Sequence, residues 1–462
     1  MTAPWKTPGG TGDSPVSERS SPGPAARNGG EDRRIACPTN TAGGTLVNNI
    51  EWAVRLKKEV AENILPFWAR HAVDVENGGF YGKIDCDLKI DPQAPRAAVI
   101  NARILWTYAA ACRLIDSTYR DMADRAWNYI MDRFWDSQHG GIYWTVDYLG
   151  KAISCRKQIY AQAFAIYGMA EYFRATGNTQ SLERAKQLYH LIEAHSYDPV
   201  HKGYIEACAR DWGTLEDMRL SEKDLNSPKS MNTHLHILEA YTNLLRVWRD
   251  PGLLASQKEL LEVTLEHIVD QRTAHFRMFF DAEWNSLTDH ISYGHDIEGS
   301  WLIVEAAEVV GDASLLDRAR QLAIRMADAV AREAVDRDGS IFYEANSAGV
   351  WIDPNKHWWA QAEAVVGFYN AYQLSGEERF RDLSYRAWEF IEEKVVDRAH
   401  GEWHAKLRPD GTPFQEHEDS DACLVGPWKC PYHNSRVCYE MMQRLKGSTC
   451  DMATLTTGIA SM

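Results

Sequence analysis

Apolar residues recur every three or four positions along most of the chain, with polar and charged residues between them. This spacing places the apolar side chains on one face of an α-helix. The pattern predicts twelve helices, at residues 49–71, 98–114, 118–134, 157–175, 179–194, 230–248, 254–270, 294–310, 313–333, 357–374, 377–395 and 431–446. Short stretches of glycine, aromatic and β-branched residues lie between successive pairs of helices, which indicates tight β-like turns.

A short motif returns in these turns. It reads GFYGKID from Gly79, GIYWTVD from Gly141, GYIE from Gly203, GSIFYE from Gly339 and GEWH from Gly401. Successive glycines are 62, 62, 136 and 62 residues apart, and the longest interval holds a copy without its glycine, FRMFFD from Phe276. The chain therefore contains six units of about 62 residues, each with two helices.

The second helix of each unit is strongly apolar and rich in small residues. Examples are QAFAIYGMAEYF at 162–173 and QAEAVVGFYNAY at 361–372. Helices of this kind are buried on most sides, whereas an open solenoid needs polar-faced repeats at its ends. We therefore predict an all-α fold, an (α/α)6 barrel of six helical hairpins with short β-hairpin-like connections.

The two ends of the chain differ from this pattern. The N-terminus is rich in Pro, Gly and Ser and lacks the apolar stretch of a signal peptide. We predict a disordered extension at 1–45, a catalytic barrel at 46–447 and a C-terminal tail at 448–462.

The composition of the chain excludes some classes of binding partner. The net charge of −15 argues against a nucleic-acid partner and against an acidic membrane surface. The chain has no run of 18 apolar residues, so we expect no membrane span. Its nine cysteines are scattered and include no CxxC pair, so the sequence favours neither a disulfide framework nor a structural zinc site. A reducing cytoplasm is therefore the expected location of the protein. The 17 tryptophans fit a sugar site, although most are expected in the core.

Polar and titratable residues gather at the starts of the second helices. They are Asn101 and Arg103, Tyr160, Asn232, His234 and His236, His295 and Glu298, Trp358, and His433. In a closed barrel these six starts meet at one end, to which the helices present their positive dipole ends. Three histidines and one arginine at corresponding positions of four units indicate function rather than packing. The sequence thus predicts a pocket at this end.

Two kinds of chemistry fit this site less well. His295 and Glu298 have a spacing that di-iron bundles use. However, His234 and His236 would point in different directions, and few Glu residues are expected at this end. Glycoside hydrolysis needs a pair of carboxylates. Its candidates here are Glu298, Asp296 and Asp224.

Histidine pairs suit proton abstraction next to a carbonyl, because an imidazole can take or give a proton near neutral pH. The enediolate that forms needs hydrogen-bond donors, which Arg103 and the helix N-termini would supply. The chain has no GxGxxG motif and no P-loop. We therefore expect neither a cofactor nor a metal.

Four segments carry a family resemblance. They are NTHLHILEAY (232–241), SYGHDIEGSWL (292–302), KHWWAQAEAVVGF (356–368) and WKCPYHN (428–434). These segments resemble the cellobiose 2-epimerases, a family within the N-acylglucosamine 2-epimerase superfamily of (α/α)6 barrels. The resemblance runs from about Glu51 to Leu445, and Ala360 departs from it by replacing an expected proline, which would alter the loop rim.

The resemblance implies an isomerase that interconverts glucose and mannose at the reducing end of β-1,4-linked disaccharides. It would convert cellobiose to glucosyl-mannose, and lactose to epilactose, through ring opening and a cis-enediolate. By resemblance, His295 and His433 exchange the C2 proton, and His236 assists ring opening or holds the intermediate. Arg103 would stabilise the enediolate, and Glu298 would orient a histidine and bind hydroxyls.

The same resemblance implies that Trp358 and Trp428 hold the sugar, and that Tyr160, Asp224 and Asn232 bind its hydroxyls. The expected partner is a disaccharide, and the expected protein is a cytoplasmic monomer or weak homodimer. Two alternatives stay open. One is an N-acylglucosamine 2-epimerase or a mannose or glucose isomerase of the same superfamily, and the other is a sugar-binding barrel without catalytic activity.

Overall fold

The computed structural model describes residues 48–457, with side chains up to Lys446, so the predicted extension 1–45 lies outside the described residues. The second helices of the six units are α3 (Ala98–Leu114), α5 (Ile159–Thr176), α7 (Met231–Leu245), α9 (Tyr293–Val310), α11 (Trp358–Ser375) and α13 (Tyr432–Thr457). The twelve predicted helices are all present, and α13 runs past the predicted end at 446.

The first helices are more often composite. They comprise α1 (Asn49–Lys58), η1 (Glu59–Ile64), α2 (Leu65–Phe67) and η2 (Trp68–Ala72); η3 (Ser117–Tyr119), α4 (Arg120–Tyr129) and η4 (Ile130–Phe134); α6 (Thr179–His195); α8 (Pro251–Val263) and η5 (Thr264–Ile268); α10 (Ala313–Glu333); and α12 (Glu378–Phe390) and η6 (Ile391–Val395). Except for η3, which is a 3-10 turn, the η segments are π-helical. Four of the six first helices therefore end in a π turn, which apolar spacing does not reveal.

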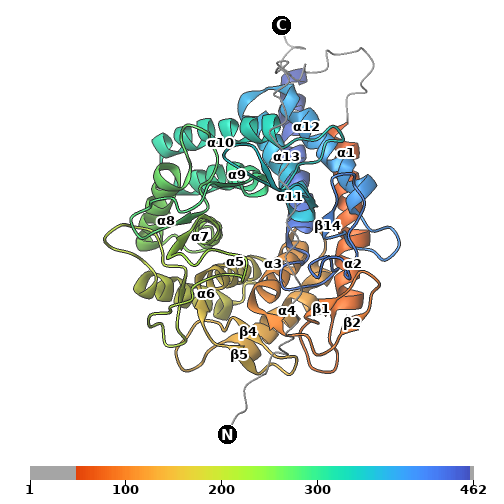
Figure 1. Ribbon diagram of the computed structural model, residues 1–462. Helices are drawn as coiled ribbons and strands as arrows, with labels where there is room; N and C mark the ends of the chain where they lie inside the picture. The colour runs from red at the N-terminus through yellow and green to blue at the C-terminus, as the bar shows by residue number, and fades with distance from the viewer. Residues whose placement is uncertain (1–47, 458–462) are drawn as a thin grey trace, which may run out of the picture. The chain divides into compact units, whose positions relative to one another are not determined.

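The helices form two concentric rings (Figure 1). The inner ring is α3, α5, α7, α9, α11 and α13, and each inner helix packs on its inner neighbours. The inner ring closes because α13 contacts both α11 and α3. The residues of α5 from Ile159 to Tyr172 are all buried, whereas α10 buries only one stripe of its surface. The predicted (α/α)6 barrel is confirmed.

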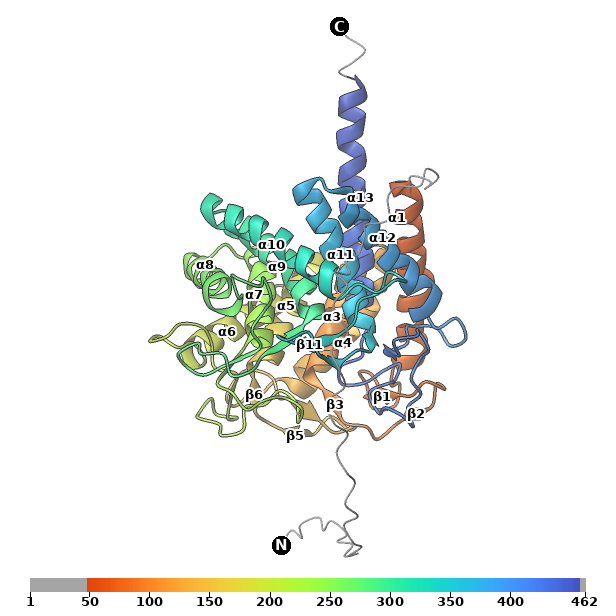
Figure 2. The ribbon, with the colours of Figure 1, turned by 45° about the horizontal axis from the view of Figure 1, so that its top comes forward.

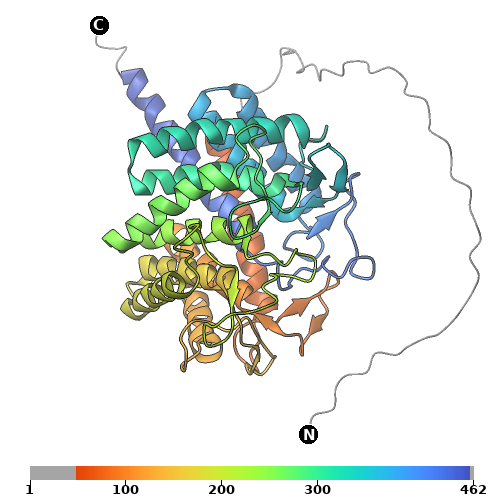
Figure 3. The same ribbon diagram turned by 60° about the vertical axis from the view of Figure 1, so that its left-hand side comes forward.

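Short strands connect the units at the end of the barrel where the inner helices begin (Figures 2 and 3). They are β1 (Lys83–Ile84), β2 (Ile90–Asp91), β3 (Arg96–Ala97), β4 (Thr145–Val146), β5 (Ala152–Ser154), β6 (Lys157–Gln158), β7 (Ala207–Cys208), β8 (Lys229–Ser230), β9 (Phe279–Phe280), β10 (His290–Ser292), β11 (Glu344–Asn346), β12 (Trp351–Asp353), β13 (Lys356–His357) and β14 (Lys406–Leu407). The strand before an inner helix pairs antiparallel with a strand of the next unit, as β6 does with β7. An Ile84–Val425 bridge joins the first unit to the last.

Buried ion pairs reinforce these connections. A cation two residues before an inner helix pairs with an aspartate of the preceding turn, in Arg96–Asp74, Lys157–Asp136, Lys229–Asp198 and Lys356–Asp336. The fourth unit differs, because His275 occupies the place of the repeated glycine. It hydrogen-bonds to Asp296 of α9 at 2.7 Å and to Glu333 of α10 at 3.0 Å. The histidine that replaces the glycine in the fourth repeat thus forms a different set of ion pairs.

No helix in the described part of the chain is both long enough and apolar enough to cross a membrane.

Candidate active site

The inner helices share one register. The backbone N–H of the first residue of each helix donates to a carbonyl of the next unit, in Ala98–Trp144, Ile159–Glu206, Met231–Met278, Tyr293–Tyr343 and Trp358–Ala405, at 2.8–3.1 Å. Positions on different inner helices can therefore be compared by counting from this residue. In α13 the count starts at Pro431, which has no N–H to donate.

In several units the side chain of the fourth residue in the register hydrogen-bonds to backbone groups of the preceding turn. Gln162 and Gln361 each accept a hydrogen bond from the N–H of the preceding turn and donate one to its carbonyl. In the third unit His234 takes this place, since its Nε2 accepts from Tyr204 N–H at 2.9 Å and its Nδ1 bonds to Ser230 O at 2.6 Å. Burial lowers the pKa of His234 to about 4. Both ring nitrogens are engaged, so His234 is structural.

Most of the predicted catalytic residues lie at the third and sixth positions of the register. His295 and His433 occupy the third position, and Arg103, His236 and Glu298 occupy the sixth. The expectation that three histidines and one arginine correspond is therefore wrong, because two positions are involved. Residues three apart share a helix face, so both positions reach one interior. Their side chains nevertheless converge at the N-terminal end of the inner ring, which we call the mouth.

His433 is held by a carboxylate. Its Nδ1 lies 2.7 Å from Glu363 Oε1 of α11, whose other oxygen accepts from Trp301 Nε1 at 3.0 Å. Burial raises the pKa of Glu363 to about 8. Burial, and then the nearby positive charge of Arg436, lowers the pKa of His433 well below its usual range. The resting imidazole is therefore neutral, and its Nε2 is left for chemistry.

His236 is held in the same manner. Its Nδ1 lies 2.9 Å from Glu239 Oε2, and Glu239 Oε1 accepts hydrogen bonds from Tyr432 and Arg436. Burial lowers the pKa of His236 to about 3. A second neutral imidazole with a fixed ring thus faces the same interior.

Arg436 links the carboxylates beneath the histidines. Its guanidinium donates to Glu239 and Glu298, and to Glu363 at 2.6 Å. All four side chains are about 1% exposed. Glu298 contacts Arg436 directly and lies 3.9 Å from His433 Nδ1, so the carboxylate that orients His433 is Glu363.

His295 has a hydroxyl partner instead. Its Nδ1 lies 2.7 Å from Ser292 Oγ, the residue before α9. Burial, followed by the electrostatic effect of His236 and Arg103, lowers the pKa of His295 to about 3. The Trp359 ring contacts both candidate acid–base residues, with its centroid 4.7 Å from His295 and 5.5 Å from His433.

Arg103 lies beside these histidines. It donates to Tyr160 Oη at 2.8 Å and stacks on Phe164 and Tyr432, with its Cζ 4.2 and 5.0 Å from their ring centroids. Its Nε has no hydrogen-bond partner among the described residues. The guanidinium is therefore a buried, preorganised cation that can face a developing oxyanion.

The predicted sugar-binding residues take varied places. Trp428 is 36% exposed, with its ring 6.1 Å from Tyr160, whereas Trp358 is 5% exposed and covered by Lys429. The buried Oδ1 of Asn232 has no partner within the described structure and is an open acceptor. Asp224 lies in the loop before β8 and accepts from Ser221 N–H at 2.8 Å.

The departure at Ala360 is not on the rim. Ala360 is fully buried within α11, against Gly294 of α9. The expected effect on the loop rim is therefore wrong.

The mouth contains more carboxylates than the sequence suggested. Glu239 and Glu363 belong to the site and were missed, although Glu363 shares the sixth position of the register with Glu298. Ligand atoms of Glu298, Glu363 and His433 lie within 4.8 Å of one another, as a metal would require. The Arg436 guanidinium already donates hydrogen bonds to both acidic side chains, so the donor set does not call for a further cation.

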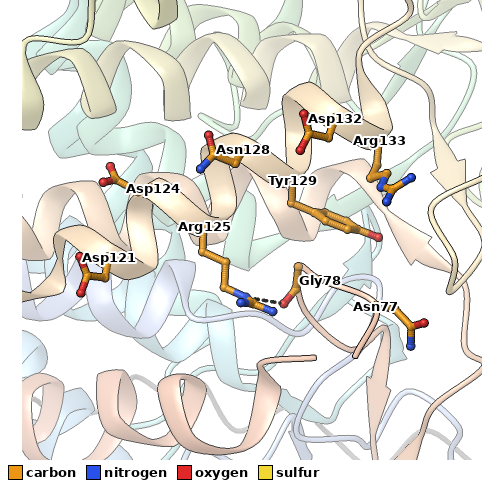
Figure 4. A pocket seen from close by; sticks show the side chains of 10 residues that line it. Asn77, Gly78, Asp121, Asp124, Arg125, Asn128, Tyr129, Asp132 and Arg133 are labelled. Atoms are coloured by element: carbon orange, nitrogen blue, oxygen red, sulfur yellow. Dashed lines mark hydrogen bonds between the residues drawn. The ribbon is translucent and has the colours of Figure 1, made fainter. Parts of the chain in front are cut away.

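A separate pocket of about 420 Å3 lies between residues 77–79 and α4 of the outer ring (Figure 4). Its lining mixes acids and bases, including Asp121, Asp124 and Arg133. Arg125 spans it by donating to the Gly79 carbonyl at 2.9 Å. This pocket is a polar joint between two units and lacks the histidines of the mouth.

Comparisons with known proteins agree with this arrangement. A family model described as N-acylglucosamine 2-epimerase (GlcNAc 2-epimerase) matches residues 79–422. The chain is 47% identical to the cellobiose 2-epimerase of Bacteroides fragilis, over 84% of this chain and 97% of that protein. The solved structure of the cellobiose 2-epimerase from Bacillus thermoamylovorans B4167 is 38% identical, with a TM-score of 0.80, covering 86% of this chain and 100% of that one. The D-mannose isomerase of Marinomonas mediterranea is 22% identical over 83% of this chain and 95% of that protein.

Proposed function

Because the chain belongs to the N-acylglucosamine 2-epimerase family, we propose that it is a cellobiose 2-epimerase. The reaction is the reversible inversion of C2 in the reducing-end sugar of a β-1,4-linked disaccharide. The observation that carries the proposal is the pair His295 and His433. Both are buried, both have a fixed Nδ1, and both contact Trp359.

Inversion at C2 requires an acid–base group on each face of the intermediate. In the proposed mechanism the sugar ring opens, and one histidine removes the C2 proton as a general base. The lowered pKa values of His295 and His433 keep both rings neutral, which suits this first step. The other histidine returns a proton to the opposite face. When His433 is the donor, it gives up its Nε2–H while Glu363, whose pKa is raised to about 8, passes a proton to Nδ1, so the ring stays neutral.

The negative charge of the cis-enediolate develops on the sugar oxygens. Arg103 and the hydroxyl of Tyr160, which it contacts, supply positive charge and a hydrogen bond from a preorganised position. His236, fixed by Glu239, assists ring opening or holds the intermediate. Glu298 acts through Arg436 rather than by orienting a histidine directly.

A disaccharide is favoured over a monosaccharide by the aromatic surface at the mouth. The Trp428 ring centroid lies about 6 Å from those of both Tyr160 and Trp144, and Trp428 remains exposed for a second sugar to stack on. We propose cellobiose and lactose as substrates, with epilactose as the product from lactose. The seven free cysteines of the described chain support a reducing cytoplasm, and we propose a monomer or weak homodimer.

The test is incubation of the purified protein with cellobiose, lactose, mannose and N-acetylmannosamine in D2O. We expect deuterium at C2 of the epimerised disaccharides, measured by NMR. Label in N-acetylmannosamine or mannose alone would assign the chain to a monosaccharide epimerase or isomerase instead. Incorporation in none of the four sugars would indicate a sugar-binding barrel without catalytic activity.

A further inference from the structure

Residues 213–228, which we call the strap, connect β7 to β8 in the third unit. The strap ends at β8, which leads into its own helix α7, but it touches other units along its length. Met218 O accepts a hydrogen bond from Gln158 Nε2 of the second unit at 3.0 Å. Farther along, Lys223 Nζ lies 2.7 Å from Asp421 Oδ2 of the sixth unit. Since α7 lies across the ring from α13 (Figure 1), the strap reaches the opposite side of the mouth.

The charge of Asp224 confirms this course. Its carboxylate raises the pKa of Glu206 in the third unit and also that of Glu344 in the fifth, in each case as an addition to the larger effect of burial. Asp224 is therefore near enough to influence one residue of the third unit and one of the fifth. It follows Lys223 directly in the chain, so the contact of Lys223 places Asp224.

The partner of Lys223 belongs to an acidic segment whose other members already have cations. In residues 415–421, Glu416 pairs with Lys83, Glu418 with Arg408, and Asp419 with Lys406. Asp421 pairs with Lys223. Lys223 is thus the cation that the strap contributes to this segment from across the mouth.

The pair is open to water, with side chains 82% and 60% exposed. Exposed ion pairs contribute little stability and weaken as salt screens them. A contact of this kind can break and form again during each catalytic cycle. It suits a strap that must move for a sugar to enter and must then return above it.

We propose that Lys223 and Asp421 form a latch that positions the strap, and with it Asp224, over the bound sugar. Neither residue takes part in the chemistry, so both are positioning residues. The role of Asp224 in sugar binding rests on the proposed function. The closure of the strap by the latch does not, and it can be measured without substrate.

The test uses a charge exchange. Lys223→Glu and Asp421→Lys each place like charges together, and the double variant restores an opposite pair in the reverse order. Hydrogen–deuterium exchange of residues 213–228 should become faster in each single variant and return toward wild type in the double variant. For cellobiose, KM should rise about two- to fivefold in the single variants while kcat changes less than about twofold. High salt should raise KM in the wild type and leave the single variants nearly unchanged.

Lys258→Glu is the matched control, because it breaks an exposed pair with Asp312 on the outer ring, away from the mouth. It should leave KM and the exchange of residues 213–228 unchanged. Unaltered exchange in both single variants, or no recovery in the double variant, would overturn the latch. Altered and recovered exchange without any change in KM would overturn the placement of Asp224 over the sugar. If the wild type epimerises no sugar, the proposed function fails while the exchange result still decides the latch.

Discussion

Arg436 is the most informative position for testing the buried network. Its guanidinium serves Glu239, Glu298 and Glu363 at once, and these side chains are almost fully shielded from water. Arg436→Met keeps much of the apolar packing on Trp301 and Tyr432 and removes the charge. Three carboxylates would then lie buried without their cation.

Removing one partner of a buried ion pair costs about 3–5 kcal/mol of unfolding free energy. The carboxyls can reduce this cost by taking up protons, so their pKa values should rise in the folded variant. A carboxyl whose pKa is higher in the folded than in the unfolded state lowers the free energy of unfolding at high pH. This loss of stability becomes smaller as the pH falls, because the folded state then binds the proton. The difference between wild type and variant should shrink by about 1.4 kcal/mol per pH unit for each carboxyl that stays protonated.

The assay is urea unfolding of both proteins at pH 6 and pH 8, with kcat for cellobiose measured alongside. We expect the larger stability difference at pH 8 and a loss of kcat at both values, because Glu363, which orients His433, loses its hydrogen bond from Arg436. Arg436→Lys keeps the charge without the planar fork and should fall between the two. A stability difference below about 1 kcal/mol, or an equal difference at both pH values, would refute the assignment of Arg436 as the neutralising group.

Three further predictions concern histidines. His295→Asn and His433→Asn should each slow C2 epimerisation by about 10²–10⁴-fold while calorimetry still detects cellobiose binding; retained turnover would remove that residue from the acid–base pair. Although burial opposes it, hydrogen bonds to Asp296 and Glu333 raise the pKa of His275 to about 10 from 6.5. This contribution to stability is complete below about pH 6.5 and is lost toward pH 10, so urea unfolding across that range should show an alkaline decline that His275→Gln abolishes. An unchanged pH slope would contradict this. His234→Gln should preserve thermal stability and activity, whereas His234→Leu should lose stability; equal losses would argue against a purely structural histidine.

The helices could be predicted closely because their apolar spacing is long and regular. The predicted helix 98–114 coincides with α3, and 313–333 coincides with α10. Each inner helix is buried by its neighbours, so the local pattern and the tertiary packing favour the same structure. The π turns could not be predicted, because they shift the backbone register without changing which residues are apolar.

The site could be predicted only in part. His295 and His433 lie in recognisable segments, and their titratable side chains at helix starts suggested chemistry. The link between Glu363 and Arg436 spans 73 positions and depends on two inner helices meeting inside a closed ring. The spacing of residues along the sequence does not show that these two side chains are in contact. The structural task of His234 was hidden for a similar reason, since its partner is a backbone N–H 30 positions away.

The register of the inner helices has a consequence for how such a protein can evolve. In four units the fourth residue secures the preceding turn, whereas the proposed acid–base groups His295 and His433 occupy the third position of their helices. A substitution of His295 or His433 can therefore change the reaction without loosening the connections between units. Because the scaffold task is met by Gln, His or Asp in different units, that position also tolerates exchange. The barrel thus separates residues that hold its units together from residues that are available for the diversification of sugar chemistry.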